Sequence, residues 1–421
     1  MADFGVGDLV RFRLAHEELE GTVLESSDSS VVLLKLPSGY NIGVPREHIL
    51  RHRIIKKYKE LMVVERRQAK QEGAGKGIGL IVTGGTIASR LDPRTGGVKP
   101  VQSVGEMAVL YPELFQKVAV KEVAMPFRIL SESMSSEHWK EIAVIAEKML
   151  NRDDINGIII THGTDFLAYT GAALSFFLQD LNKPVVLTYS QRSIDRASSD
   201  AHLNLSCAVQ MALSDCAEVL LVGHATGSDD YCYALRAVSA RKLHSSKRDA
   251  FKAVNAESVA RVFSDRIEFM GRYKKRKGGR VILDDTYSDK VALVKFYPGQ
   301  DPSILDFYVL KYQGVVIEAA GLGHVAASDS LHSWIPALKK HIRNGFIVCF
   351  APQTIFGRVD PWVYANGRDL QDAGVIFLEG MLAETALVKL GWVLGHYGWK
   401  KYVKEKMLEN VAGELNDRIT G

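Results

Sequence analysis

The sequence predicts an α/β protein in which two parallel-sheet domains follow a small β-barrel. Short β-rich segments separated by turn formers fill the first 55 or so residues. Apolar, strand-like runs then alternate with helical patterns, which is typical of βαβ units. A basic, glycine-bearing segment at 272–280 divides this alternating region in two. The chain has 421 residues, more than one hydrophobic core usually serves, so several domains are expected.

Residues 1–58 are predicted to form a small SH3-like β-barrel, a module that docks or packs more often than it catalyses. Turn formers such as Ser27-Asp28-Ser29 separate its β-rich runs, and short strands at this spacing indicate a barrel. A linker with a helical pattern at 60–71 and several glycines is predicted at 59–77. The predicted strands of the barrel are 9–12, 21–24, 31–36 and 41–44.

The alternating region is predicted to form two α/β domains, at 78–275 and 290–421. In the first domain, strands are predicted at 80–82, 157–160, 185–188 and 219–222, with helices at 137–150 and 166–181. In the second, strands are predicted at 292–297, 315–319 and 346–350, with helices at 331–343, 381–394 and 400–414.

Composition limits the class of protein. Hydrophobic residues make up 47% of the chain and charged residues 24%, as in an ordinary packed domain. The net charge of +4 permits a polyanionic partner without requiring one. No run approaches the roughly 18 apolar residues of a membrane span, and the first residues lack the features of a secretory signal. We therefore expect a cytoplasmic protein without a membrane partner. The four scattered cysteines form no CxxC pair and are expected to be buried free thiols, with no metal site.

Two threonine-bearing turns contain the candidate catalytic residues. Thr83-Gly84-Gly85-Thr86-Ile87-Ala88-Ser89 follows one apolar run, and Thr161-His162-Gly163-Thr164-Asp165 follows another. Open α/β sheets bind ligands at such strand ends, so the pair predicts one site with two hydroxyls. Threonine needs a base and an oxyanion hole to act as a nucleophile. Taken singly, the first turn would suit a structural turn or a phosphate loop, and the second a helix N-cap. The ordered pair favours catalysis.

Together the two motifs resemble the signature motifs of the bacterial-type L-asparaginase family, amidohydrolases that use a threonine nucleophile. The resemblance covers about residues 78–421 and implies an asparaginase-like two-domain fold. Within it, Thr86 matches the nucleophile. Thr164 and Asp165 match the second threonine and the aspartate that binds the substrate α-amino group, with Gly85 and Gly163 as substrate-binding positions beside them.

The resemblance also implies a catalytic lysine downstream, near an Ala-Phe pair. Lys242 is the choice, and Lys247 is the weaker alternative because it lies closer to Phe251 than the family spacing suggests. A solvated basic face is the other interpretation of both lysines. Ser131 and Glu132 lie where the family places a pair that binds the substrate carboxylate, although Ser131 would also suit a helix N-cap.

Other positions bear on the site less directly. The loop 90–97 lacks the tyrosine that asparaginases carry after the nucleophile, so we expect a partner or substrate to complete the site. Segment 191–193 either borders the site or is a plain loop, and His324 either reaches the site of a neighbouring subunit or is a satisfied turn histidine. The basic segment 274–277 either contacts tRNA phosphate or forms a solvated hairpin tip.

The N-terminal barrel, Ser131-Glu132 and the segment EGMLAETALVKL at 379–390 resemble the D-type subunit of the archaeal glutamyl-tRNA(Gln) amidotransferases. This implies a dimeric glutaminase without its own cofactor. Its partner, the E-type subunit, would use the ammonia with ATP and Mg²⁺ to convert Glu-tRNA(Gln) to Gln-tRNA(Gln). The alternatives are a free-standing L-asparaginase/glutaminase and a non-catalytic binding module. A nucleotide loop is disfavoured because this turn has neither GxGxxG nor GK[ST].

Overall fold

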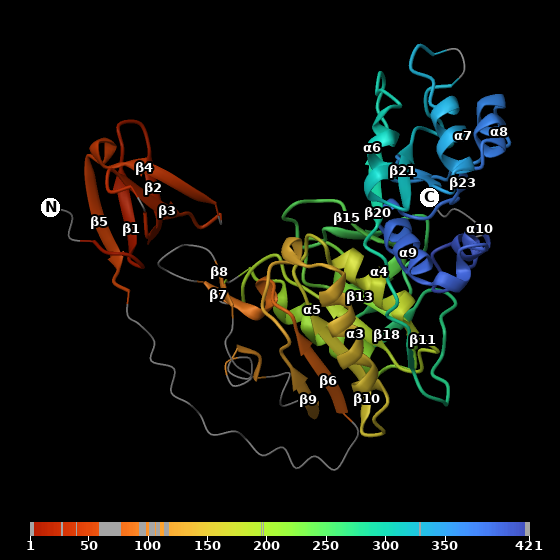
Figure 1. The fold of residues 1–421 in the computed structure, drawn as a ribbon. Helices are drawn as coiled ribbons and strands as arrows, with labels where there is room; N and C mark the ends of the chain where they lie inside the picture. The colour runs from red at the N-terminus through yellow and green to blue at the C-terminus, as the bar shows by residue number, and fades with distance from the viewer. Residues whose placement is uncertain are drawn as a thin grey trace.

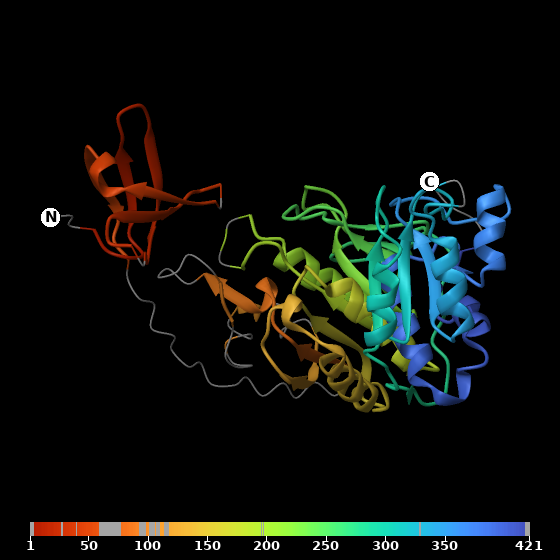
Figure 2. The same ribbon diagram turned by 45° about the horizontal axis from the view of Figure 1, so that its top comes forward.

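The computed structural model describes residues 4–26, 28–38, 40–58, 77–91, 98–100, 106, 110–112, 118–194, 196, 198–327 and 330–416. The predicted linker helix at 60–71 and most of the loop 90–97 lie outside these residues. In Figure 2 the described parts of the chain lie side by side in the order of the sequence, from the N-terminal unit (red) to the C-terminal unit (blue). Within them, no helix is both long enough and apolar enough to cross a membrane.

The N-terminal unit is a five-stranded antiparallel sheet in the order β4-β3-β2-β1-β5 (Figure 1). Alternate residues face its small core, where Val10, Phe12 and Leu34 are fully buried. The last strand was not predicted, because its sequence RHRIIK is basic and mostly exposed and shows no apolar alternation. The strands are β1 Leu9–Arg13, β2 Glu18–Leu24, β3 Val31–Lys35, β4 Asn41–Pro45 and β5 Arg51–Lys56.

The middle domain is built on an eight-stranded sheet in the order β18-β17-β14-β13-β12-β10-β6-β9. The five strands from β13 to β9 are parallel, and the other three are antiparallel. The central parallel strands are covered on both faces. Nearly all of their side chains are therefore apolar, and the sequence shows them as continuous apolar runs. The strands are β6 Gly77–Val82, β9 Val120–Ala124, β10 Ile155–Thr161, β12 Val185–Thr188, β13 Val219–His224, β14 Cys232–Arg236, β17 Ala260–Val262 and β18 Ile267–Phe269. Short pairs are β7 Ser89–Leu91 with β8 Val98–Pro100, and β11 Leu178–Gln179 with β19 Ile282–Leu283.

Helices cover this sheet on both sides. Helices α3 (Ser136–Leu150) and α4 (Leu167–Phe177) contribute to one core cluster, and α5 (Ala201–Leu213) contributes to the other. From β6 the chain moves outward to β9 and then crosses back to β10 on the opposite side of β6. This is the 2-1-3-4-5 strand order, whose switch point between the first and third strands is where ligands bind. The carboxyl ends of β6 and β10 form that switch point.

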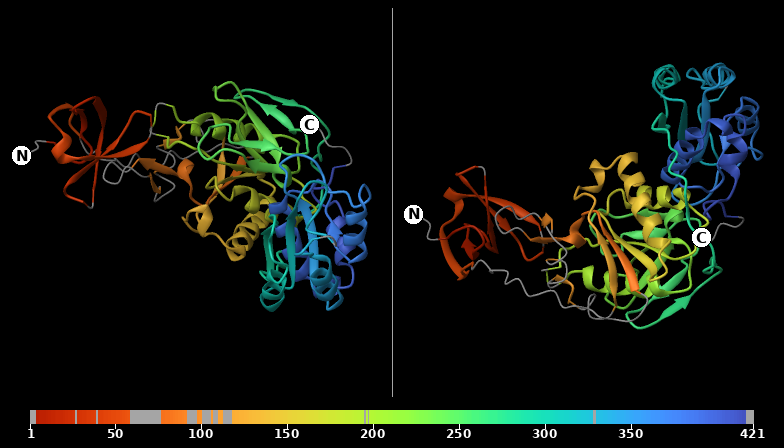
Figure 3. Two further views of the ribbon diagram at one scale, coloured as in Figure 1. Left: turned by 90° about the horizontal axis from the view of Figure 1, so that it is seen from above. Right: turned by 60° about the horizontal axis from the view of Figure 1, so that its bottom comes forward.

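The C-terminal domain contains the four-stranded parallel sheet β20-β21-β22-β23. Its helix α9 packs against α4 of the middle domain, and residues of both helices share one core cluster. Both views in Figure 3 show the C-terminal domain (blue) in direct contact with the middle domain (orange to green). The elements are β20 Val291–Lys295, α6 Ile304–Lys311, β21 Gly314–Ala319, α7 Ile335–Arg343, β22 Ile347–Pro352, α8 Ala365–Asp372, β23 Ile376–Phe377, α9 Ala383–Gly395 and α10 Val403–Leu408.

The predicted helix at 400–414 was too long, because α10 ends at Leu408. The reason is Lys389, which is fully buried in α9. Its Nζ donates hydrogen bonds to the carbonyl oxygens of Met407 and Glu409, and it lies 2.5 Å from Glu414 Oε1. A buried ammonium group requires such partners, and burial also lowers the pKa of Lys389. The chain therefore winds around this cation instead of extending the helix.

Candidate functional site

The two threonine turns meet at the carboxyl ends of β6 and β10. The backbone N–H and the hydroxyl of Thr83 both donate to the carbonyl oxygen of Thr161, at 3.2 and 2.8 Å. Gly85 has φ of +80°, and a Cβ built on it would lie 2.6 Å from Gly163 N and from His162 O. Only a glycine permits this approach. The structure thus places Thr86 and Thr164 on two turns that touch one another.

This contact makes Gly85→Ala a sharp test of the arrangement. The backbone conformation at Gly85 is open essentially to glycine alone and would cost alanine roughly 1–3 kcal/mol, before the overlap with His162 and Gly163 is counted. We expect a lower free energy of unfolding, measured by urea denaturation. Gly278→Ala is the matched control, since a Cβ there meets nothing within 4 Å. Wild-type stability in Gly85→Ala would contradict the contact.

Lys242 joins the second turn directly. Its Nζ donates to Thr164 Oγ1 and to Asp165 Oδ1, each at 2.8 Å. Lys242 ends β15 (Ala240–Lys242), which pairs with β16 (Phe251–Ala253) in a two-stranded hairpin. The Lys242 side chain is 13% exposed and that of Asp165 is 60% exposed. Lys247 is exposed in the loop of the same hairpin, so the geometry favours Lys242 over Lys247 as the lysine of the site.

Thr86 is the first residue of the 3₁₀ turn η2 (Thr86–Ala88) and is half-buried. Its hydroxyl has no hydrogen-bond partner among the residues that the structure describes. The turn is fixed from its other side: Ser89 Oγ donates to Gly85 O at 2.8 Å, and the Tyr111 hydroxyl donates to Ile87 O at 2.5 Å. Sequence reasoning missed Tyr111, because it lies in neither motif and nothing in its local sequence points to the turn.

His162 is a buried part of the second turn that was given no role from the sequence. Its Nδ1 lies 2.7 Å from Gly163 O, and its Nε2 lies 2.9 Å from Thr170 Oγ1. A carbonyl oxygen can only accept, so Nδ1 carries the proton and Nε2 accepts from the threonine hydroxyl. Burial lowers the pKa of His162 to about 4. The ring is therefore neutral, and its two hydrogen bonds connect the second turn to Thr170 of helix α4.

This lowered pKa predicts a pH-dependent contribution to stability. The unfolded ring takes up a proton below its ordinary pKa of 6.5, whereas the folded ring resists protonation down to about 4. The unfolded state thus binds more protons in this window, so stability is complete above about pH 6.5 and falls by up to about 3 kcal/mol toward pH 4. In His162→Gln the urea midpoint should fall less steeply between pH 6.5 and 4 than in the wild type. An identical slope in both proteins would contradict this, and exposed His332→Gln is the control.

Ser131 is brought to the second turn, with Glu132 beside it. Ser131 is buried at the start of η3 (Ser131–Ser133), and its Oγ accepts the backbone N–H of Phe166 at 3.3 Å. A Cβ on Gly163 would lie 3.0 Å from this Oγ, so the two residues touch. Glu132 is exposed. Helix α3 is capped by Ser135, so the N-cap role considered for Ser131 belongs to another serine.

The remaining candidates lie on other elements. His324 is half-buried in the C-terminal domain, with its ring 5.3 Å from that of Tyr364. The basic segment 274–277 is mostly exposed, and two of its lysines have partners in the molecule: Lys274 Nζ donates to Val411 O at 2.9 Å, and Lys277 Nζ lies 2.7 Å from Asp180 Oδ1.

Three family models match the chain. They are the GatD N-terminal domain over residues 4–55, the N-terminal asparaginase domain over 77–275 and the glutaminase/asparaginase C-terminal domain over 290–407. The last two cover the part of the chain that contains the site.

Similar proteins of known name span nearly the whole chain. The D-type subunit of glutamyl-tRNA(Gln) amidotransferase from Thermococcus kodakarensis is 45% identical over 423 residues, covering 98% of this chain and 94% of the relative. The corresponding subunit from Pyrococcus furiosus is 45% identical, covering 97% and 94%. That from Sulfurisphaera tokodaii is 37% identical, covering 98% and 92%.

Solved structures confirm the predicted asparaginase-like fold. The thermostable L-asparaginase from Thermococcus kodakarensis matches with a TM-score of 0.72 at 28% identity, covering 82% of this chain and 99% of the asparaginase. L-asparaginase I from Vibrio cholerae matches with a TM-score of 0.69 at 27% identity, covering 82% and 100%. The antiparallel N-terminal unit precedes the two asparaginase domains, as predicted.

Proposed function

Because the chain belongs to the family of D-type subunits of the glutamyl-tRNA(Gln) amidotransferases, we propose that it hydrolyses glutamine and passes the ammonia to a partner subunit. The observation that carries the proposal is the contact of Lys242 with Thr164 and Asp165, on the turn that touches Gly85, the residue before Thr86. A hydroxyl, an amine and a carboxylate in this arrangement suit amide hydrolysis.

In the proposed mechanism Lys242 is the base. A neutral amine has two N–H groups, which are used on Thr164 and Asp165, and one lone pair, which accepts the proton of the Thr86 hydroxyl. Thr86 Oγ1 attacks the amide carbon of glutamine, and N–H groups of the glycine turn stabilise the oxyanion. Lys242 returns the proton to the leaving nitrogen, which departs as ammonia. Water then cleaves the acyl ester and restores the Thr86 hydroxyl.

Substrate recognition is assigned to groups around the second turn. The carboxylate of Asp165 is 60% exposed and suits the α-amino group of glutamine. Ser131, in contact with Gly163, together with Glu132, occupies the side where the substrate carboxylate would bind. The attacking and assisting threonines could exchange roles, which the identity of the acylated residue would reveal.

The ammonia is proposed to reach the E-type subunit, which would activate the glutamate of Glu-tRNA(Gln) with ATP and Mg²⁺ and amidate it to Gln-tRNA(Gln). This chain needs no cofactor of its own for its half of the reaction, and it is proposed to act as a dimer in the cytoplasm. The alternative function is that of a free-standing L-asparaginase/glutaminase, which the fold alone would equally permit.

The test compares glutamine hydrolysis by the chain alone and by the chain with its partner subunit and Glu-tRNA(Gln). We expect little hydrolysis by the isolated chain and a strong increase in the complete complex. Rapid hydrolysis of asparagine by the isolated chain would favour the free-standing enzyme instead.

A further inference from the structure

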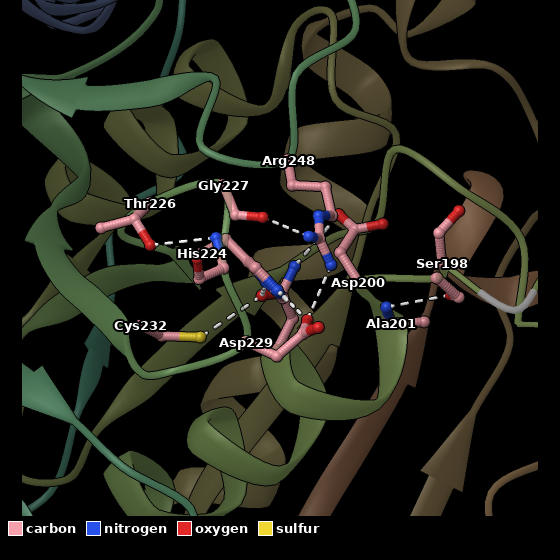
Figure 4. Close-up of polar contacts among 12 residues, drawn as sticks. Ser198, Asp200, Ala201, His224, Thr226, Gly227, Asp229, Cys232 and Arg248 are labelled. Carbon is pink, nitrogen blue, oxygen red and sulfur yellow. Dashed lines mark hydrogen bonds and ion pairs between the residues drawn. The ribbon is translucent and has the colours of Figure 1, made fainter. Parts of the chain in front are cut away.

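A second polar cluster, which includes Asp200, His224, Asp229 and Arg248, lies at the carboxyl edge of the same sheet (Figure 4). At its centre is His224, the last residue of β13, which is 1% exposed. Its Nδ1 lies 2.5 Å from Asn204 Oδ1, and its Nε2 lies 2.9 Å from Asp229 Oδ1. No step of the proposed mechanism uses these side chains, although they are buried or ion-paired beside the site.

Both ring nitrogens of His224 have a polar partner. Asn204 Nδ2 donates to Tyr189 O at 2.9 Å, so Asn204 turns its oxygen to the histidine. Cys232 Sγ donates to the same oxygen at 3.3 Å. Asp229 offers a carboxylate oxygen. Both ring nitrogens of His224 therefore face acceptor oxygens. The hydrogen bond from His224 holds the pKa of Asp229 below its usual value.

Asp229 connects this histidine to the hairpin. Arg248 Nη1 donates to Asp229 Oδ1 at 2.7 Å, and Arg248 Nη2 donates to the carbonyl oxygen of Gly227. Lys252 Nζ donates to Ala225 O at 2.9 Å. Two cations of the hairpin thus bind the loop between β13 and β14, and Asp229 contacts both His224 and Arg248.

These polar contacts hold the hairpin near its tip, beyond the buried Phe251. Its strands are only three residues long, and they pair Lys242 with Phe251. The tip at 244–247 is exposed. An isolated two-stranded hairpin has marginal stability, so external contacts determine where it lies. The distances of 2.8 Å from Lys242 to Thr164 and Asp165 require a fixed position.

The other end of the cluster reaches the strand next to β10. Buried Asp200 accepts the backbone N–H groups of Gln191 and Arg192, at 2.9 and 3.0 Å, just after β12. Its Oδ2 lies 3.5 Å from Asn204 Nδ2. A continuous set of polar contacts therefore runs from the end of β12, through the start of α5 and the end of β13, to Arg248 on the hairpin.

Building on the proposed function, we propose that Asp229 and Arg248 are positioning residues for proton transfer. Their ion pair, supported by His224, holds the Lys242 hairpin so that the amine of Lys242 meets Thr164 and Asp165. Neither residue is assigned a contact with the substrate. They act through the position of Lys242.

The test uses Asp229→Asn and Arg248→Met in the complete complex with partner subunit and Glu-tRNA(Gln). Asp229 is 64% exposed and lies at the surface of the cluster, so its amide variant should fold. We expect kcat with glutamine to fall about 10- to 100-fold with KM nearly unchanged, since displacement of a catalytic group by about 1 Å costs this much. Ammonia-dependent amidation should be unaffected. Hydrogen exchange of residues 240–253 should become faster.

Matched controls are Asp230→Asn and Lys247→Met. Asp230 is exposed beside Asp229, and Lys247 is exposed beside Arg248; neither side chain has a hydrogen bond or ion pair among the described residues. Both controls should match the wild type in kcat and in exchange. Unchanged exchange in Asp229→Asn and Arg248→Met would overturn the inference, as would faster exchange with a wild-type kcat. A wild-type complex that uses only ammonia would instead overturn the proposed function, and exchange alone would then decide whether the ion pair anchors the hairpin.

Discussion

Replacing Lys242 with methionine should lower glutamine-dependent amidation by about 10²- to 10⁴-fold, the range that a positioned general base contributes. Methionine keeps most of the apolar length of lysine and removes only the amine that contacts Thr164 and Asp165. Amidation supplied with ammonia should be unchanged, because it bypasses this site. The measurement is the rate of Gln-tRNA(Gln) formation by the complex with each nitrogen donor.

The matched control is Lys247→Met, in the exposed loop of the same hairpin. It removes one positive charge from the loop that joins β15 to β16 and should leave both rates at the wild-type level. If Lys247→Met abolished glutamine use while Lys242→Met retained it, Lys247 would be the lysine of the site and the proposed base would be wrong.

Replacing Thr86 with valine should have the largest effect of any single change, on the order of 10⁴- to 10⁶-fold in glutamine-dependent kcat. Valine has nearly the same shape as threonine, so the turn η2 and its contacts through Ser89 and Tyr111 should persist. Only the hydroxyl is lost. Glutamine turnover and ammonia-dependent amidation are measured side by side, and ammonia use should be retained.

Thr86→Ser and Thr164→Val sharpen this test. Serine keeps a hydroxyl and should retain measurable glutamine turnover. Thr164→Val should lower kcat by less than Thr86→Val, because it removes a partner of Lys242 and not the attacking oxygen. A Thr86→Val complex that consumed glutamine at the wild-type rate would exclude Thr86 as the nucleophile.

The fold could be predicted where local sequence carries the structural signal. The buried parallel strands β6, β10, β12 and β13 are continuous apolar runs, so their positions follow from the sequence. Strand β5 carries no such signal, because pairing with β1 determines it. The end of α10 at Leu408 depends on buried Lys389, through contacts between residues about twenty positions apart.

The residues of the site divide in the same way, into those with a local sequence signal and those placed by contacts between distant elements. Thr86, Thr164 and Asp165 lie in short motifs directly after strands, so the sequence predicts them. Lys242 needed a family resemblance, because a lysine in a hairpin has no local signature. Tyr111 and the cluster around His224 could not be predicted at all. They reach their places through contacts between distant elements, such as Tyr111 with Ile87 and Arg248 with Asp229.

The proposed chemistry requires that the Thr86 hydroxyl attacks glutamine with Lys242 as its base. Covalent trapping with 6-diazo-5-oxo-L-norleucine, a glutamine analogue with an electrophilic carbon, measures this step directly when mass spectrometry of the intact complex and its peptides follows. We predict a single adduct on Thr86 that is absent in Thr86→Val and strongly slowed in Lys242→Met. An adduct on Thr164, or modification that proceeds equally fast without Lys242, would contradict this assignment of nucleophile and base.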